Sequence, residues 1–462
     1  MAVRIGEEET ARQRAFAKEV TAHPARPETY FVVTYGCQMN VRDSETIAGM
    51  LEEMGMTRAE RREDAEFVIF NTCCVRDNAE RRALGNVTWL KEIRKNHPRM
   101  MIAVCGCMAQ REGFAEKMMR QYPFVDIVFG TSNAHELPEM VLNALESRGR
   151  VRKVDQTDYV VEGLPARRES PYSAFVNISY GCDNFCTYCI VPYVRGRERS
   201  REPGEILKEI EGLKKSGVKE IMLLGQNVNS YGKGLADNIS FAELLRMADK
   251  TGMERIRFMS SHPKDLSEEL MEVMAGSRNI LPQFHLPVQS GNDEILKRMN
   301  RHYTREEYLE KVRKLREYVP GIGISTDIIV AFPGETESQF EDTAALVREA
   351  RYISAFTFIY SPREGTRAAE FDGRVPEEIA RERIERLIAL QEGMQKEVFR
   401  EYIGTEEEVL IESVSRRNAH QVSGKGRHGI SITMDGNESE IGQIVKCRVT
   451  EAKQNTLIGE RI

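Results

Sequence analysis

Short apolar segments alternate with amphipathic segments along most of this chain, and this alternation limits its fold more than any other feature. Between residues 28 and 146, YFVVTYGC, AEFVIFNTCC, MMIAVCGC and PFVDIVFG each precede a stretch with helical character. In DSETIAGMLEEMG, for example, Ile47, Leu51 and Met54 fall on one helical face. This pattern is typical of a parallel sheet covered by helices, so residues 28–146 are expected to form an α/β domain.

A second series of strands lies between residues 168 and 398. AFVNISYGC, KEIMLLGQ, RIRFMSS, QFHLPVQ, IGISTDIIVAFPG and AFTFIYS are separated by helical stretches, which predicts a partial (β/α) barrel. In such barrels the chemistry gathers at the carboxyl ends of the strands. Most polar side chains there are expected to cap or support loops; they are Gln226, Asn227, Ser260, Ser261, His262, Gln289, Ser290, Thr326 and Asp327.

Three further segments complete the expected organisation. Residues 1–27 are polar and are expected to be a disordered tail. Residues 147–167 are charged and read as a linker with one short strand. Residues 401–462 combine short strands with glycine-containing turns, which indicates a small β-barrel. Three domains suit a length of 462 residues.

Composition points to the compartment in which the chain works. No apolar run reaches the roughly 18 residues of a membrane span, and the charged start lacks the apolar core of a secretory signal. We therefore expect a cytoplasmic protein without membrane contact. In a reducing compartment, nine cysteines are more typical of metal or redox ligands than of disulfides. The net charge of −6 requires that any nucleic acid bind to local basic patches.

Three distant cysteines of the first domain share one position in the pattern. Cys37, Cys73 and Cys107 each stand where a strand ends, and the carboxyl ends of parallel strands lie at one edge of a sheet. The three thiols can therefore meet. They could instead be small buried residues, as free cysteines often are. Zinc would need a fourth ligand, and the local candidates, His97 and His135, do not stand at strand ends.

A denser group opens the second domain. Cys182, Cys186 and Cys189 form C-x3-C-x2-C directly after a strand. Three thiolates at this spacing favour a 4Fe-4S cluster, and the missing fourth cysteine leaves one iron open to the amino and carboxylate groups of S-adenosylmethionine. A zinc knuckle is the alternative, but no histidine follows closely enough to complete it.

Basic residues give two candidate RNA contacts. RGRERSR places Arg195, Arg197, Arg199 and Arg201 beside the cysteine loop as a possible phosphate patch. The alternative is a solvated charge run that pairs with Glu198 and Glu202. In the last segment the basic side chains that cluster on expected loops are Arg416, Arg417, Lys425, Arg427 and His428.

Motifs around these residues resemble one enzyme family over nearly the whole chain. YGCDNFCTYCIVPYVRGRERSR is similar to the cluster loop of radical S-adenosylmethionine (SAM) enzymes. TYGCQMN, NTCC, CGCMAQ, LLGQNVNSYG, HLPVQSGNDEILKRMNR and TDIIVAFPGETE resemble the methylthiotransferase family of those enzymes, and GCQMN with VPYVRGRERSR is most similar to its MiaB branch. Residues 401–462 resemble the TRAM module, a tRNA-binding domain.

The resemblance implies two 4Fe-4S clusters and S-adenosyl-L-methionine as cofactors. Motif by motif, Cys37, Cys73 and Cys107 would hold the auxiliary cluster, and Cys182, Cys186 and Cys189 the radical cluster. Cys74 and Cys105 are extra, and each lies so close to a ligand that an exchange stays open. Contacts to SAM are expected from Tyr188, Gln226, Gln289 and Asp327; no side chain is assigned a catalytic role.

The same resemblance implies an activity and partners. One SAM would methylate a sulfide on the auxiliary cluster, and a second would yield the radical that removes hydrogen from carbon 2 of N6-dimethylallyladenosine next to the anticodon. The expected partners are the anticodon stem-loop of tRNA and a reductant such as flavodoxin or ferredoxin, with the enzyme a monomer. Alternatives are a methylthiotransferase for threonylcarbamoyl-adenosine or for a ribosomal-protein aspartate, and an iron–sulfur protein that binds tRNA without turnover.

Overall fold

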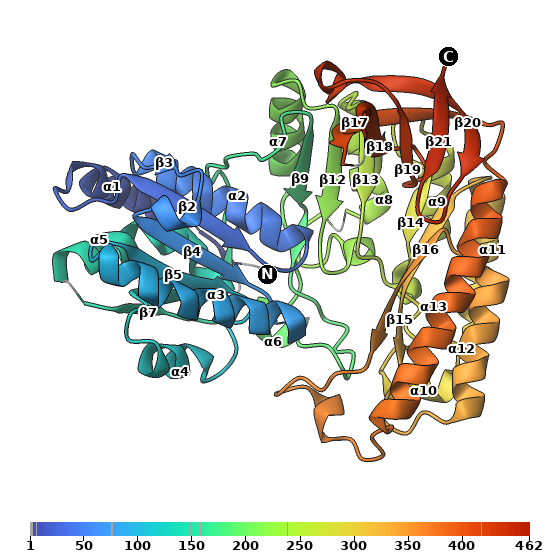
Figure 1. Ribbon diagram of the computed structural model, residues 1–462, viewed down its shortest axis with the longest axis horizontal. Coiled ribbons are helices and arrows are strands. Elements are labelled where there is room, and N and C mark those ends of the chain that lie inside the picture. Colours follow the sequence, from blue (N-terminus) through green and yellow to red (C-terminus); the bar gives the residue numbers. More distant parts are fainter. Residues whose placement is uncertain are drawn as a thin grey trace.

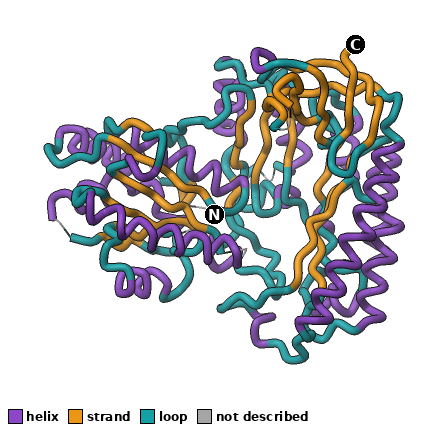
Figure 2. Tube along the Cα trace, viewed as in Figure 1, coloured by secondary structure: helices purple, strands orange, loops and turns teal. Residues whose placement is uncertain are grey.

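The computed structural model describes most of the chain, namely residues 3–5, 7–74, 77–147, 149–157, 159–237, 239–416 and 418–462. Its elements form two α/β units and a β-barrel (Figures 1 and 2). Within these residues, no helix has the length and apolar character needed to cross a membrane. Arg417, one of the basic residues singled out above, lies outside the described residues.

The first unit is built on a six-stranded parallel sheet. The strand order is β3-β2-β4-β5-β6-β7. The strands are β2 (Thr29–Thr34), β3 (Thr57–Arg58), β4 (Phe67–Thr72), β5 (Met101–Gly106), β6 (Ile127–Phe129) and β7 (Val151–Lys153). All residues of β4 and β5 are buried because helices cover both faces of the sheet.

Two hydrophobic cores lie on the two faces of this sheet. One face packs against α1 (Glu7–Ala22), α2 (Gln38–Glu53) and α5 (Leu137–Ser147). The other packs against α3 (Asp77–Asn96) and α4 (Phe114–Gln121). Figure 1 shows these helices on either side of the blue and teal strands.

The disordered tail predicted for residues 1–27 is wrong for most of that range, because α1 packs on the domain. Ala17 and Val20 are buried against the core, and Arg12 forms an ion pair with Glu139 of α5 at 2.6 Å. The partner lies more than a hundred residues away, which is why the local pattern did not reveal this helix. The segment 147–167 holds two strands instead of one, since β7 extends the sheet and β8 (Tyr159–Val160) pairs with β1 (Val3–Arg4).

The second unit is a partial barrel of six parallel strands in sequence order. β9, β12 and β13 form one sheet and β14, β15 and β16 another, and a parallel bridge between Ile256 and Ile280 joins them. The strands are β9 (Ser173–Asn177), β12 (Glu220–Leu224), β13 (Arg255–Phe258), β14 (Gln283–His285), β15 (Gly323–Val330) and β16 (Ser354–Ile359). Its helices are α7 (Pro203–Lys215), α8 (Phe241–Lys250), α9 (Glu268–Ala275), α10 (Asp293–Arg298), α11 (Arg305–Tyr318), α12 (Glu337–Ala350) and α13 (Glu377–Arg400).

The last unit is the closed five-stranded barrel that the sequence predicts. Its order is β17-β18-β19-β21-β20, with β17 (Glu406–Ser415), β18 (Asn418–Lys425), β19 (Ser431–Asp435), β20 (Ile444–Ala452) and β21 (Leu457–Arg461). It docks on the amino ends of the partial-barrel strands. Arg255, fully buried at the first position of β13, donates to the carbonyl of Lys425 at 2.9 Å, and Arg257 donates to the carbonyl of Gly426 at 2.8 Å.

Candidate active site

The first three predicted ligands stand at the carboxyl edge of the amino-terminal sheet. Cys37 is the N-cap residue of α2, Cys73 directly follows β4, and Cys107 directly follows β5. β2 and β4 are neighbours, but the chain leaves them in opposite directions along the sheet, toward β3 and β5. This reversal is a topological switch point, where open α/β sheets bind their ligands. The structure therefore places the three thiols where the sheet geometry favours a site.

Two glycines allow the loops to approach one another. Gly36 has φ +116°, and a Cβ there would lie 2.6 Å from the Cβ of Cys73. Gly106 has φ +91°, and a Cβ there would meet the backbone of Thr72, whose carbonyl accepts from the Cys107 amide at 3.0 Å. Any side chain at either position would push the cysteine loops apart.

Asn40, a residue to which the sequence assigned no role, ties these loops together. Its side chain is fully buried and donates to the carbonyls of Tyr35, at 2.8 Å, and Thr72, at 3.0 Å. Its Oδ1 lies 3.8 Å from the Sγ of Cys37 and 3.9 Å from that of Cys107. The asparagine of GCQMN therefore fixes the loop of each predicted ligand relative to the next.

The two extra cysteines differ in position. Cys105 is buried in the core under α1, α2 and α5, whereas Cys107 belongs to the core on the other face, because the turn at Gly106 separates them. Cys74 lies beside the site. A hydrogen bond with Cys74, helped by the charge of Arg195, lowers the pKa of Cys107 to about 6, and the same bond and burial raise the pKa of Cys74. Of the two extra cysteines, Cys74 therefore lies closer to the predicted ligands and stays the alternative to Cys73.

The second cysteine group lies on a loop held from several sides. Gly181 has φ +71°, and the amide of Cys182 donates to the carbonyl of Gly196 at 3.2 Å. Thr187 donates through its amide to Met299, at 3.0 Å, and through its hydroxyl to the carbonyl of Arg298, at 2.8 Å. The loop is thereby anchored to the carboxyl end of α10.

The buried thiols of this loop suit a bound metal group. Burial raises the pKa of Cys182 to about 11, and burial with the nearby Cys186 thiol raises the pKa of Cys189 to about 12. Arg301, buried and missed by the sequence analysis, lies 3.6 Å from the Sγ of Cys186. Crowded buried thiols ionise readily only when a metal neutralises them, so the donor set fits an iron–sulfur cluster.

The predicted SAM contacts fall into different surroundings. Tyr188 is half-buried and packs on the apolar cluster of Ile295, Met299, Phe332 and Ala368. Gln289 has φ +69°, and its amide donates to the carbonyl of Asp327 at 2.9 Å. The carboxylate of Asp327 lies 3.5 Å from the Nε2 of His285. Gln289, which follows β14, and Asp327 of β15 are thus neighbours.

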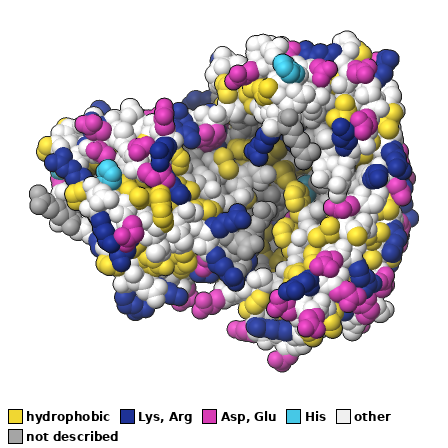
Figure 3. Space-filling model, in the orientation of Figure 1, with side chains coloured by type: hydrophobic (Ala, Val, Ile, Leu, Met, Phe, Trp, Pro, Cys, Tyr) yellow, Lys and Arg dark blue, Asp and Glu magenta, His cyan; other side chains and the backbone are white. Residues whose placement is uncertain are grey.

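Gln226, the fourth of these residues, reaches the other domain. Its Nε2 lies 2.8 Å from the Sδ of Met39 in α2. Gln38 likewise donates to the Sδ of Met259, just beyond β13, at 3.8 Å. The start of α2 therefore rests on the carboxyl ends of barrel strands, so the two cysteine-bearing edges face each other. In Figure 3 the surface between the two units is hollowed, with Lys and Arg side chains on its rim.

Other polar residues at the strand ends support loops, as expected. Asn227 donates to Asp265 at 2.6 Å and accepts from the His262 amide at 3.1 Å. His262 is buried, and burial together with the charge of Arg301 lowers its pKa. Thr326 donates to the carbonyl of Leu286 at 2.9 Å.

The phosphate patch predicted for RGRERSR is wrong for three of its four arginines. Arg195, Arg199 and Arg201 are buried. Arg201 pairs with Glu162 at 2.6 Å and with Glu209 at 2.8 Å. Arg197 alone of the four is exposed, and it lies 2.8 Å from Asp183. The sequence could not show this because the partners are distant in the chain: those of Arg201 come from the linker and from α7, and those of Arg195 from the amino-terminal domain.

The basic cluster predicted in the β-barrel also needs correction. Arg427 faces the partial barrel and donates to the carbonyl of Arg278, whereas His428 is paired within the β-barrel, 2.6 Å from Glu407 of β17. Lys425 is partly buried and donates to Ser431 at 2.9 Å. Of the described members of this cluster, only Arg416 is exposed.

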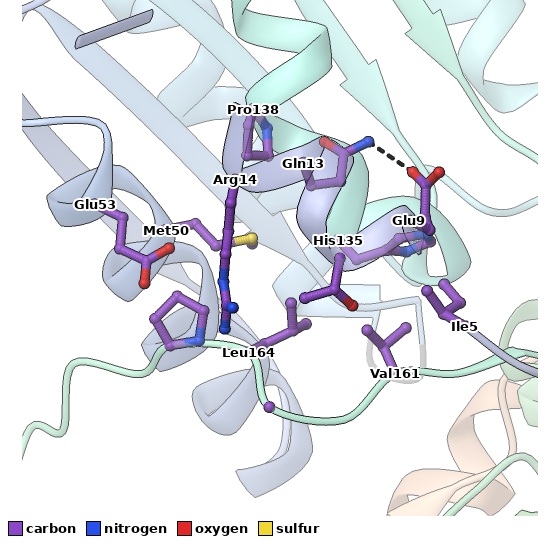
Figure 4. Close-up of a pocket in the computed structure, with 13 residues that line it drawn as sticks. Ile5, Glu9, Gln13, Arg14, Met50, Glu53, His135, Pro138, Val161 and Leu164 are labelled. Atoms are coloured by element: carbon purple, nitrogen blue, oxygen red, sulfur yellow. Dashed lines mark hydrogen bonds between the residues drawn. The ribbon is translucent and has the colours of Figure 1, made fainter. Parts of the chain in front are cut away.

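Neither histidine considered for zinc joins the cysteines. His97 is exposed beyond the end of α3. His135 is buried beside Glu9 and Glu136, with ligand atoms within 4.8 Å of one another. Figure 4 shows Glu9 and His135 on the wall of a cavity between α1 and α2. Because Glu9 already pairs with Arg12 at 2.9 Å and Glu136 with Lys153 at 3.4 Å, we assign no metal there.

Comparison with known families covers all three units. The profile described as Radical SAM superfamily matches residues 176–347, that of uncharacterized protein family UPF0004 matches residues 29–130, and that of the TRAM domain matches residues 400–462. Among solved structures, the radical S-adenosylmethionine methyltransferase TsrM from Kitasatospora setae, with cobalamin and a [4Fe-4S] cluster bound, is similar in fold. The TM-score is 0.53 at 16% identity, covering 74% of this chain and 76% of that one.

Curated relatives match over nearly their full length. The tRNA-2-methylthio-N(6)-dimethylallyladenosine synthase of Clostridium perfringens (strain SM101 / Type A) is 48% identical over 436 residues, which cover 93% of this chain and 97% of the relative. The protein of the same name from Alkaliphilus oremlandii (strain OhILAs) is 49% identical over 435 residues, covering 94% and 92%. The chain belongs to the family of tRNA-2-methylthio-N(6)-dimethylallyladenosine synthases.

Proposed function

We propose that this chain is a radical SAM methylthiotransferase that modifies carbon 2 of N6-dimethylallyladenosine in tRNA, next to the anticodon. The observation that carries the proposal is the placement of two cysteine sets on facing carboxyl edges, linked through the contacts of Gln226 with Met39 and of Gln38 with Met259. Sulfur delivery and radical generation are separate tasks, and two facing sites serve both on one substrate.

The proposed ligands rest on the motif matches, and the geometry described above supports them. Cys182, Cys186 and Cys189 would hold one 4Fe-4S cluster, and Cys37, Cys73 and Cys107 the other. When bound, these groups and SAM supply the radical that removes hydrogen from carbon 2 and the sulfur that replaces it. Tyr188, Gln226, Gln289 and Asp327 would line the SAM side of the site.

The protein's own residues shape the site in three ways. Arg301 places a positive charge 3.6 Å from the Sγ of Cys186, on the buried side of the cysteine loop. Asn40 holds the loops of the auxiliary site in register. Tyr188 offers an aromatic face beside the cluster loop, where the adenine of SAM can stack. A donor such as flavodoxin or ferredoxin, a cytoplasmic location and a monomeric state complete the proposal.

Iron analysis of anaerobically reconstituted protein tests the ligand sets. The parent should hold about eight irons, in two 4Fe-4S clusters. Replacement of Cys182, Cys186 and Cys189 together by alanine should leave about half the iron and abolish release of 5′-deoxyadenosine. Cys447→Ala is the matched control, because this thiol is buried in the β-barrel. Complete loss of iron, or continued SAM cleavage, in the triple variant would refute the assignment.

Nucleoside mass spectrometry tests the substrate. Incubation with tRNA that carries N6-dimethylallyladenosine should add a methylthio group, and tRNA that carries threonylcarbamoyl-adenosine should stay unchanged. Product from the second tRNA alone would move the chain to another branch, and no product from either, with no 5′-deoxyadenosine, would indicate a binding protein.

A further inference from the structure

Arg195 crosses from the partial-barrel domain into the amino-terminal site. It is the last residue of α6 (Val191–Arg195), six positions after Cys189. Its side chain is 6% exposed and carries a charge, so burial is unfavourable unless specific partners compensate. Among the described residues, the side chains to which its guanidinium is hydrogen-bonded or paired belong to the amino-terminal domain.

Those contacts fix the guanidinium in one orientation. One terminal nitrogen donates to the Oδ1 of Asn40 at 2.8 Å and pairs with the carboxylate of Asp43 at 2.8 Å. With that side of the planar group held, its Nε–H donates to the Sγ of Cys107 at 3.2 Å. A planar fork of donors suits this arrangement, which the single ammonium of lysine cannot reproduce.

We infer that Arg195 is a positioning residue that couples the two cysteine loops, donating a charge-assisted hydrogen bond to a ligand sulfur of the auxiliary cluster. The inference rests on the proposed role of Cys107 as a ligand. Hydrogen bonds to ligand sulfurs and nearby positive charge favour the reduced state of an iron–sulfur cluster. Arg195 therefore raises the reduction potential of the auxiliary site, and it does so from the segment that follows the radical loop.

The helix that carries Arg195 has other attachments. Thr131 donates to the carbonyl of Val194 at 2.7 Å, and Arg199 donates to the carbonyl of Arg195 at 2.9 Å. Ile190 and Val194 are buried in the core beneath α3 and α4. Removal of the guanidinium should therefore leave α6 docked, so that its effect on the sulfur can be measured in a folded protein.

Redox titration followed by electron paramagnetic resonance tests the inference. The parent is the full-length variant with Cys182, Cys186 and Cys189 replaced by alanine, which should hold the auxiliary cluster alone. Arg195→Gln should shift the midpoint potential to a more negative value and change the spectrum of the reduced cluster. Arg195→Lys keeps the positive charge but lacks the planar set of guanidinium donors, so it should shift the midpoint potential less than Arg195→Gln does. Arg197→Gln, an exposed neighbour on the same loop, should leave the potential unchanged.

The outcomes separate the inference from the proposed function. A parent without iron would refute the ligand set and with it the role of Arg195. An iron-loaded parent whose potential and spectrum do not change in either Arg195 variant would refute the inference alone. If Arg195→Gln does not retain iron, Arg195→Lys decides: a shifted potential supports the hydrogen bond, and an unchanged one overturns it.

Discussion

Asn40→Ala should destabilise the amino-terminal domain and empty its cysteine site. The change removes two hydrogen bonds to backbone carbonyls, at 2.8 and 3.0 Å, and one from the charged Arg195, at 2.8 Å. A buried neutral bond contributes about 1 kcal/mol and a bond to a charged group about 1.5–3 kcal/mol. We therefore expect the free energy of unfolding to fall by about 3–5 kcal/mol, which corresponds to roughly 10 °C in the melting temperature of a domain of this size.

Asn133→Ala is the matched control for this change. Asn133 is 2% exposed in the same domain, donates to Glu136 at 2.7 Å and accepts from the Asp155 amide at 2.8 Å. It contacts none of the cysteine loops through these bonds, so it should cost similar stability while leaving the iron content unchanged. Calorimetry of the iron-free proteins and iron analysis after reconstitution measure the two effects separately.

Two results would contradict the role given to Asn40. If Asn40→Ala keeps the iron of the parent, the loops do not depend on this side chain for their register. If Asn133→Ala loses iron to the same extent, the loss reflects general instability of the domain. Only loss of iron in the Asn40 variant beyond that of an equally destabilised control supports the argument.

Two further predictions concern the remaining cysteines and the β-barrel. Cys105→Ser should lower the free energy of unfolding by about 1–3 kcal/mol, because it places a hydroxyl in an apolar core, yet it should keep the iron that Cys37→Ser, Cys73→Ser and Cys107→Ser each lose. Cys74→Ser should also keep its iron. If Cys74→Ser loses iron and Cys73→Ser keeps it, Cys74 is the ligand in place of Cys73. Arg416→Ala should weaken tRNA binding several-fold and reduce the slope of log affinity against log salt by about one, whereas Arg427→Ala should leave that slope unchanged in fluorescence anisotropy.

The sequence predicted the strands well because their signal is local. Each apolar segment of the first two domains became a strand. The signal is strongest for β4 and β5, because a strand buried on both faces must be apolar whatever surrounds it. The helix α1 was missed for the opposite reason. Its sequence is polar, and its place in the fold depends on Arg12 and Gln13 meeting Glu139, a contact between distant residues.

From the sequence, only those site residues that stand at strand ends could be placed. The positions of Cys37, Cys73 and Cys107 followed from where their strands stop. The environments of Arg195 and Arg427 did not, because each is buried or paired by residues of another domain. A basic run in a sequence does not reveal whether its charges face solvent or a neighbouring domain.

The polarity of the strands also constrains the substrate. Both cysteine sets occupy carboxyl ends, whereas the β-barrel docks on the amino ends of the partial-barrel strands through Arg255 and Arg257. The longest of those strands, β15, has 8 residues and spans about 26 Å. A substrate that is bound at the β-barrel and modified at the cysteine loops must therefore extend along the height of the partial barrel. A folded RNA is long enough to do so, and a free nucleoside is not.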